Sequence, residues 1–119
     1  MKPRKLKVEY FNKDTLLAII EADYATDEIK VTNFTDNVLD KPFGNLEPTI
    51  DDLDDFFEEH IIDRNRFDIK EVLKYNGLDF YDPEAIARIS HGRTTDNNYW
   101  MRFDDEDLTW EKLLESERK

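Results

Sequence analysis

The sequence predicts a single α+β domain, in which a small, mostly antiparallel β-sheet packs with about four helices. Three observations support this prediction. The 119 residues suit one domain. Apolar residues alternate at period two near the N-terminus, whereas further along they recur at helical spacing behind residues that cap helices. We therefore expect a β-rich part at 1–35 and a helical part at 49–119, with one strand near 97–103.

The β-rich part shows the alternation that is typical of strands. Three apolar residues alternate with charged ones: Leu6, Val8 and Tyr10. This pattern predicts a half-buried strand. Two further strands are expected at 16–24 and 28–34, joined by a polar hairpin turn at 25–27. Turn formers at 36–48 indicate the crossover from the sheet to the helices.

The helical part opens at Thr49. This residue can cap a first helix, and Asp52, three residues on, completes a capping box. The apolar residues that follow fall on one helical face: Ile50, Leu53, Phe57 and Ile61. Asp68 and Glu71 form a similar box for a second helix, which is expected to end at Gly77.

A third helix is as well marked as the first. Asp82 can cap its N-terminus, and Pro83 occupies the first helical position. Ile86 and Ile89 are expected to face inward. Gly92 then ends the run.

The last part of the chain predicts one strand and one helix. Three apolar residues alternate with polar or aromatic ones: Tyr99, Met101 and Phe103. Trp100 falls on the opposite face of this strand, beside the polar Asn98 and Arg102, so it could face either a core or a partner. Thr109 is expected to cap the last helix.

Net charge is −12 and is unevenly placed. Residues 1–47 carry seven Lys/Arg against nine Asp/Glu, whereas residues 48–119 carry ten against twenty. Such a field repels nucleic acid, so we expect no direct nucleic-acid binding. An acidic body can instead occupy the basic groove of a nucleic-acid-binding protein. The competing interpretation is that the charge serves solubility alone.

The sequence also limits the compartment and the chemistry. No apolar run approaches the ~20 residues that span a bilayer, and the start lacks the apolar stretch of a signal peptide. We therefore expect a cytoplasmic protein that does not bind membranes. The chain has no cysteine, which removes disulfides and thiolate metal sites.

Motifs for catalysis are weak. Ser90 and His91 are neighbours near the end of a predicted helix, where consecutive side chains point about 100° apart, so they do not form a catalytic pair. We find no zinc motif, no EF-hand loop and no Gly-rich phosphate loop. The sequence therefore predicts no enzyme activity, no cofactor and no metal. The alternative is a hydrolase that uses the carboxylates at 104–107.

Five arginines stand out around the predicted helices: Arg64, Arg66, Arg88, Arg93 and Arg102. Guanidinium groups suit carboxylates and phosphates equally well. Because the chain holds twenty-nine acids, we expect internal carboxylates to be their partners.

The segments FFEEHIIDRNRFDIKEVLKYNGL, YDPEAIARISHGR, TDNNYWMRF and LTWEKL, in this order, resemble the N-terminal region of HipA-like proteins of Gram-positive bacteria. The resemblance covers about residues 50–114. The residues that match are Arg66, Thr95, Asp96, Tyr99 and Trp100, followed by Leu108, Thr109 and Trp110. The kinase region of that family has no counterpart in this chain, so the resemblance implies a stand-alone recognition or regulatory module.

These observations favour a protein-binding module of the phage or mobile-element kind, which blocks a nucleic-acid-binding host defence protein by mimicking nucleic acid. The alternative partner is a HipA-like kinase or toxin, contacted through the surface around Trp100 and Trp110. The residues that we expect to contact a protein partner are Asp51, Asp52, Asp54, Asp55, Glu58, Glu59, Trp100, Arg102, Asp104 and Asp105.

Overall fold

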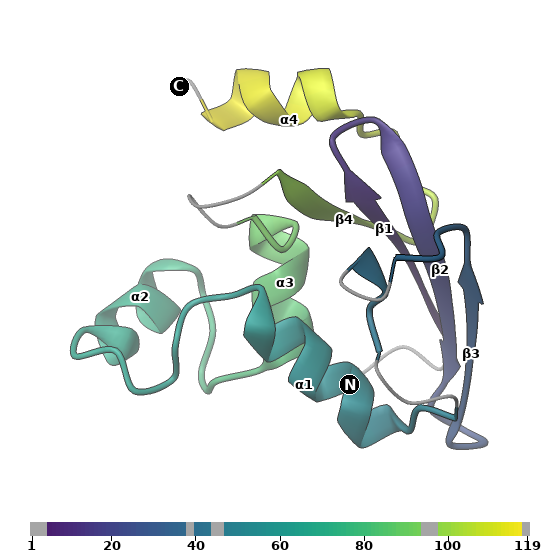
Figure 1. Ribbon diagram of the computed structural model, residues 1–119. Coiled ribbons are helices and arrows are strands. Elements are labelled where there is room, and N and C mark those ends of the chain that lie inside the picture. Colours follow the sequence, from purple (N-terminus) through teal and green to yellow (C-terminus); the bar gives the residue numbers. More distant parts are fainter. Residues whose placement is uncertain (1–4, 38–39, 44–46, 94–97, 118–119) are drawn as a thin grey trace.

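The computed structural model describes residues 5–37, 40–43, 47–93 and 98–117, and within them the chain forms one four-stranded sheet and four helices (Figure 1). The strands are β1 (Lys5–Asn12), β2 (Thr15–Asp23), β3 (Glu28–Asn33) and β4 (Tyr99–Phe103). The helices are α1 (Ile50–Glu59), α2 (Ile69–Tyr75), α3 (Pro83–Ser90) and α4 (Trp110–Glu117). The predicted α+β class is confirmed. None of these helices is long and apolar enough to cross a bilayer.

The sheet has the order β3-β2-β1-β4, and every neighbouring pair is antiparallel. Two hairpins join the first three strands. β4 comes from the far end of the sequence and pairs with β1, so that Val8 lies opposite Phe103 and Asn12 lies opposite Tyr99. The strand predicted near 97–103 therefore begins at Tyr99, and residues 94–97 lie outside the described ranges.

One face of the sheet, the α1/α3 face, carries the main core. Val8, Ile20 and Met101 project from three neighbouring strands and are fully buried. They pack against Leu53 and Phe57 of α1, which are also fully buried. Figure 1 shows α1 and α3 on the same side of the sheet. The alternation in the sequence thus identified the core side of β1 and β4 correctly.

The opposite face, the α4 face, buries a second and smaller cluster. Phe11 of β1 and Trp100 of β4 stack with their ring centroids 4.5 Å apart, and Leu113 of α4 covers them. Only 1% of Trp100 is exposed, and its indole N–H donates to the Lys13 carbonyl at 2.7 Å. Figure 1 shows β4 between α3 and α4. Trp100 therefore faces a core.

Three of the four helix caps predicted from the sequence are present. Thr49 and Asp52 form the reciprocal capping box of α1, with the Thr49 N–H donating to the Asp52 carboxylate at 2.8 Å. Asp82 caps α3, and Thr109 caps α4, each accepting from the backbone N–H three residues on. Side-chain oxygens thus satisfy N–H groups that the first turn of a helix leaves without partners.

Two local predictions were wrong. Asp68 precedes α2 but makes no capping hydrogen bond, because its carboxylate accepts from the Arg66 guanidinium instead. Ile89 is half-exposed, whereas Ile86 of the same helix is buried. Ile89 faces the side of α3 toward α2, where the neighbouring chain covers it incompletely.

The segment between α1 and α3, residues 62–81, forms the α2 excursion. Figure 1 shows α2 projecting away from the sheet. The two ends of the excursion meet where the Tyr81 hydroxyl donates to the Ile62 carbonyl at 2.6 Å. Phe67 is 95% exposed and Tyr75 is 90% exposed. The excursion therefore contributes little to the core, and the hydrogen bond between Tyr81 and Ile62 holds its two ends together.

Two glycines with positive φ test how tightly the core is packed. Gly92 has φ +64°, and a Cβ there would lie 2.9 Å from Cε of the buried Met101. Gly77 has φ +75°, but no atom lies within 4 Å of its Cβ position. We predict that Gly77→Ala lowers the free energy of unfolding by about 1 kcal/mol, from backbone strain alone. Gly92→Ala should lose about 1–3 kcal/mol more, because Met101 must move.

Chemical denaturation of both variants beside the parent chain measures the difference. Equal losses in the two variants would contradict the packing argument, since both glycines share the left-handed backbone.

Candidate functional site

The fold uses some of the acids of α1. Asp52 belongs to the capping box, and Asp54 is half-buried. Glu58 accepts a hydrogen bond from Arg64, whose guanidinium Nε lies 2.9 Å from the carboxylate oxygen. Asp52 and Glu58 therefore have contacts within the fold, and Asp54 is partly enclosed by it.

The remaining three acids form a row that the fold does not explain. Asp51, Asp55 and Glu59 are exposed and follow one another at four-residue steps, about 6 Å along the helix axis. Among the described residues, no basic side chain pairs with any of them. Like charges at this spacing destabilise a helix, and Glu59 stands in the last turn, where the macrodipole disfavours a negative charge. We call these residues the α1 acidic row.

Trp100 and Arg102 were predicted as partner contacts, and the structure places them inside the protein. Arg102 lies directly opposite Glu9 and makes a two-pronged contact with its carboxylate at 2.9 and 2.8 Å. Its guanidinium also covers the Phe11 ring, 4.8 Å from the centroid. Both residues hold β4 and α4 on the sheet, so neither offers a free surface.

Asp104 and Asp105 were also predicted as contacts, and both fasten β4 to β1. Asp104 accepts from the Lys7 backbone N–H at 2.9 Å and from the Arg88 guanidinium at 2.8 Å. Asp105 accepts from the Lys7 ammonium group at 2.7 Å. Both acids have positive φ values, as the sharp turn after β4 requires.

The rest of this acidic turn is engaged in the same way. Glu106 accepts from the Phe103 N–H at 2.8 Å, and Asp107 accepts from Lys112 at 3.1 Å. Internal contacts account for all the carboxylates at 104–107, on which the hydrolase alternative relies.

The prediction that arginines pair with internal carboxylates is confirmed for four of the five. The pairs are Arg64 with Glu58, Arg66 with Asp68, Arg88 with Glu84 and Asp104, and Arg102 with Glu9. Arg93 lies over the Trp110 ring, 5.0 Å from its centroid. The arginines thus serve the fold, and they do not converge into an anion site.

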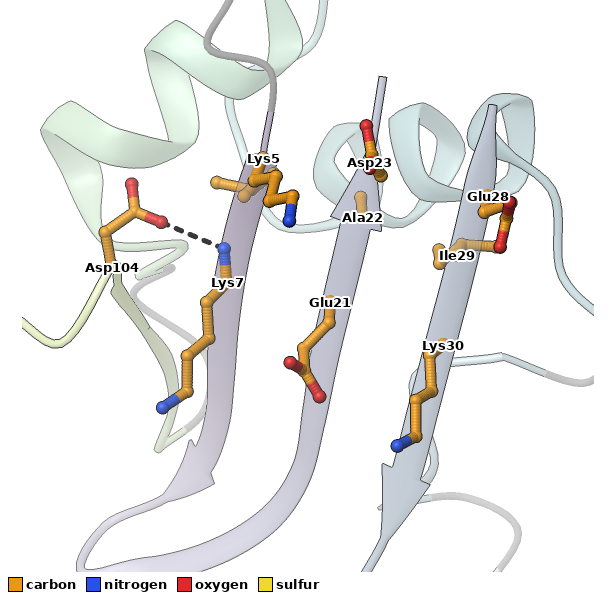
Figure 2. Close-up of a pocket in the computed structure, with 10 residues that line it drawn as sticks. Lys5, Lys7, Glu21, Ala22, Asp23, Glu28, Ile29, Lys30 and Asp104 are labelled. Carbon is orange, nitrogen blue, oxygen red and sulfur yellow. Dashed lines mark hydrogen bonds between the residues drawn. The ribbon is translucent and has the colours of Figure 1, made fainter. Parts of the chain in front are cut away.

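The exposed end of the α4 face carries a hollow of about 410 Å³. Lys7, Glu21 and Lys30 lie opposite one another on β1, β2 and β3, and Figure 2 shows the three side chains in line on one side of the sheet. Opposite charges on neighbouring strands support each other. The hollow therefore has the mixed charge of a solvated sheet face.

A second hollow, of about 260 Å³, lies on the α1/α3 face at the C-terminal end of α1, and we call it the tyrosine hollow. Its lining includes Tyr10 of β1, Tyr99 of β4, His60, Glu59 and Lys41. The rings of Tyr10 and Tyr99 are stacked 5.5 Å apart, and His60 lies 5.4 Å from Tyr10. Burial raises the pKa of the Tyr10 phenol and lowers the pKa of His60.

Sequence reasoning missed the tyrosine hollow. Its residues come from four separate parts of the chain, and no local spacing links them. His60 carries no motif in the sequence, and in the structure it contacts two aromatic rings. The pairing of β1 with β4, which brings Tyr10 to Tyr99, was the missing piece of information.

Comparisons of the chain with protein-family models, with curated proteins and with solved structures found no match. The resemblance to HipA-like N-terminal regions therefore stays a hypothesis. Two residues of its motif, Thr95 and Asp96, lie outside the described ranges. Tyr99 and Trp100 are described, and they point to opposite faces of the sheet. Their polar ends have partners: the Tyr99 hydroxyl donates to Asp40 at 2.5 Å, and the indole donates within the α4 face.

The Glu9–Arg102 pair yields a stability prediction. Glu9 is only 8% exposed, so Arg102→Met leaves a buried carboxylate without its cation and should lower the free energy of unfolding by about 3 kcal/mol. Adding Glu9→Leu removes that charge and should recover most of the loss. A double-mutant cycle by chemical denaturation measures the coupling. Simple additivity of the two losses would show that the pair is not an internal charge unit.

Two buried tyrosines predict a loss of stability at high pH. Burial raises the pKa of Tyr10, and burial together with a hydrogen bond to Glu84 raises the pKa of Tyr24. A tyrosine in the unfolded chain has a pKa near 10, below its pKa in the folded protein. The unfolded state is therefore stabilised relative to the folded state as the pH rises above about 10. The free energy of unfolding should therefore fall as the pH rises from about 10 toward 12.

Tyr24→Phe should flatten this fall, and Tyr75→Phe, at an exposed position, should leave it unchanged. Denaturation curves at a series of pH values give both slopes. A pH dependence that is the same in all three proteins would refute the assignment.

Proposed function

We propose that the chain is a non-enzymatic protein-binding module whose α1 acidic row enters a basic groove of a nucleic-acid-binding protein and competes there with nucleic acid. The observation that carries the proposal is the row itself. Asp51, Asp55 and Glu59 are exposed carboxylates at regular steps on one rigid helix, and among the described residues they lack internal cations.

The row differs from the acids that the fold uses. Asp52, Glu58 and Asp104 support the fold through hydrogen bonds or ion pairs. The row instead concentrates repulsion on one helix, and a basic partner would relieve it. Regularly spaced negative charge on a preformed helix also resembles a phosphate backbone in its electrostatics, and it needs no ordering upon binding.

The overall charge acts in the same direction. Twenty of the twenty-nine acids lie in residues 48–119, which include α1. A field of this sign speeds the encounter with a basic surface and opposes the approach of nucleic acid. A phage or mobile-element inhibitor of a host defence protein is the setting in which we expect such a module to act.

The alternative partner, a HipA-like kinase or toxin, was expected to contact the surface around Trp100 and Trp110. Trp100 is buried beneath α4, and Trp110 is half-buried and covered by Arg93. The structure thus offers no exposed tryptophan surface at this place, and the alternative has no observation of its own in its favour.

The test compares two variants of equal charge change. The row variant combines Asp51→Asn, Asp55→Asn and Glu59→Gln. The control variant neutralises three exposed acids elsewhere: Asp79→Asn, Glu111→Gln and Glu115→Gln. Each protein is immobilised and used to capture proteins from a lysate of the native host. We expect at least one protein that the parent and the control retain, and that the row variant loses.

Two further readouts separate mimicry from other binding. Duplex nucleic acid should displace the captured protein from the parent chain. Binding should also weaken steeply between about 0.1 M and 1 M salt, as the Debye length falls from about 10 Å to about 3 Å. Retention by the row variant equal to that by the control would sink the proposal, and so would binding that salt does not affect.

A further inference from the structure

The tyrosine hollow is lined by a hydroxyl that makes no hydrogen bond to the residues that the structure describes. Tyr10 is only 4% exposed and lines the hollow. Its ring packs against Phe56, His60 and Tyr99, but its hydroxyl has no hydrogen-bond partner among the residues that the structure describes. The hydroxyl is not among the enclosed side-chain oxygens without a partner, so it stays open to the hollow. A ligand in the hollow can therefore reach it and form a hydrogen bond with it.

His60 presents a second polar group to the same hollow. Its ring contacts Tyr10 and Phe56 edge to face, and within the described residues its nitrogens make no hydrogen bond. Burial lowers the pKa of His60, so the imidazole is neutral at pH 7 and can accept a hydrogen bond.

The electrostatic environment of the hollow is negative. Burial first, and then the charges of Tyr99, Asp40 and Glu59, raise the pKa of the Tyr10 phenol, and Glu59 itself lines the hollow. Tyr99 orients Asp40 through its 2.5 Å hydrogen bond, whereas Glu59 is exposed at the rim. Lys41 also lines the hollow and is the one cation among its described lining residues.

These groups favour a ligand that carries several donors and a positive charge. An ammonium group has three donors, and the hollow offers it a phenol oxygen, a neutral imidazole and the field of two carboxylates. Lys41 could pair with a carboxylate on the same ligand. The volume of about 260 Å³ limits the ligand to a small molecule.

We propose that the tyrosine hollow binds a small molecule through its ammonium group, with Tyr10, His60 and Glu59 as the binding residues. The ammonium group can belong to a simple amine or to an α-amino acid. In the second case Lys41 holds the carboxylate. This site is separate from the protein-binding role proposed above, although Glu59 borders both.

Three matched probes test which charged group of a ligand the hollow binds. Serine carries both an ammonium group and a carboxylate, ethanolamine lacks the carboxylate, and β-hydroxypropionate lacks the ammonium group. Each is titrated into the full chain at pH 7, and backbone amide shifts are followed by NMR. We expect serine or ethanolamine to give saturable shifts around Tyr10, His60 and Tyr99, while β-hydroxypropionate gives none.

The two sources of ammonium are distinguished by Lys41→Met. Tighter binding of serine than of ethanolamine, removed by this substitution, assigns an amino acid. Binding of ethanolamine that is at least as tight, and that Lys41→Met leaves unchanged, assigns an amine. No saturable shift with either probe, or equal binding of β-hydroxypropionate, would overturn the proposal.

Tyr10→Phe separates binding from folding. It removes one oxygen and keeps the ring contacts, so the free energy of unfolding should stay the same or rise. The affinity for the bound probe should fall about tenfold, as expected for a lost hydrogen bond to a charged group. Unchanged affinity would refute the role of the hydroxyl. Because Tyr10→Phe leaves the α1 acidic row intact, capture of a basic protein should persist in this variant, so the two proposals can fail independently.

Discussion

The pairing of β1 with β4 is the interaction on which the rest of the structure depends. It joins the two ends of the described chain and leaves β1 covered on both faces. Trp100 then stacks on Phe11 beneath α4, while Met101, the next residue along the strand, enters the core beneath α1 and α3. Arg102 meets Glu9 through the same register. A slip of one residue would exchange the two faces and expose both clusters.

This pairing also brings together charged side chains that form ion pairs within the fold. Arg102 pairs with Glu9, and Arg88 pairs with Glu84 and Asp104, so these charges neutralise one another within the fold. Part of the remaining negative charge lies on the exposed side of α1, as the α1 acidic row. Other exposed acids, such as Asp79, Glu111 and Glu115, lie elsewhere on the surface. Glu59, at one end of the row, borders the tyrosine hollow.

Local patterns in the sequence were sufficient for most of the elements. Alternation located β1, β3 and β4, an apolar stretch located β2, and short polar side chains marked the starts of α1, α3 and α4. Predictions failed where a residue had a choice of partners. Asp68 was available both to a helix N-terminus and to Arg66, and it took the guanidinium. The environment of Trp100 and Arg102 was ambiguous for a related reason. Spacing along one strand does not reveal what covers the second face of that strand. The tyrosine hollow was out of reach, since it depends on which strands are neighbours.

The α2 excursion has a consequence for how this architecture can vary. α1 and α3 pack on the sheet directly, and the bond from Tyr81 to Ile62 brings the ends of the excursion together. Lengthening a loop between two such fixed points is inexpensive, at roughly 0.6 kcal/mol for each doubling. Relatives of this chain can therefore carry shorter or longer segments between α1 and α3 without disturbing the sheet, and the same position is a natural place to graft a foreign domain.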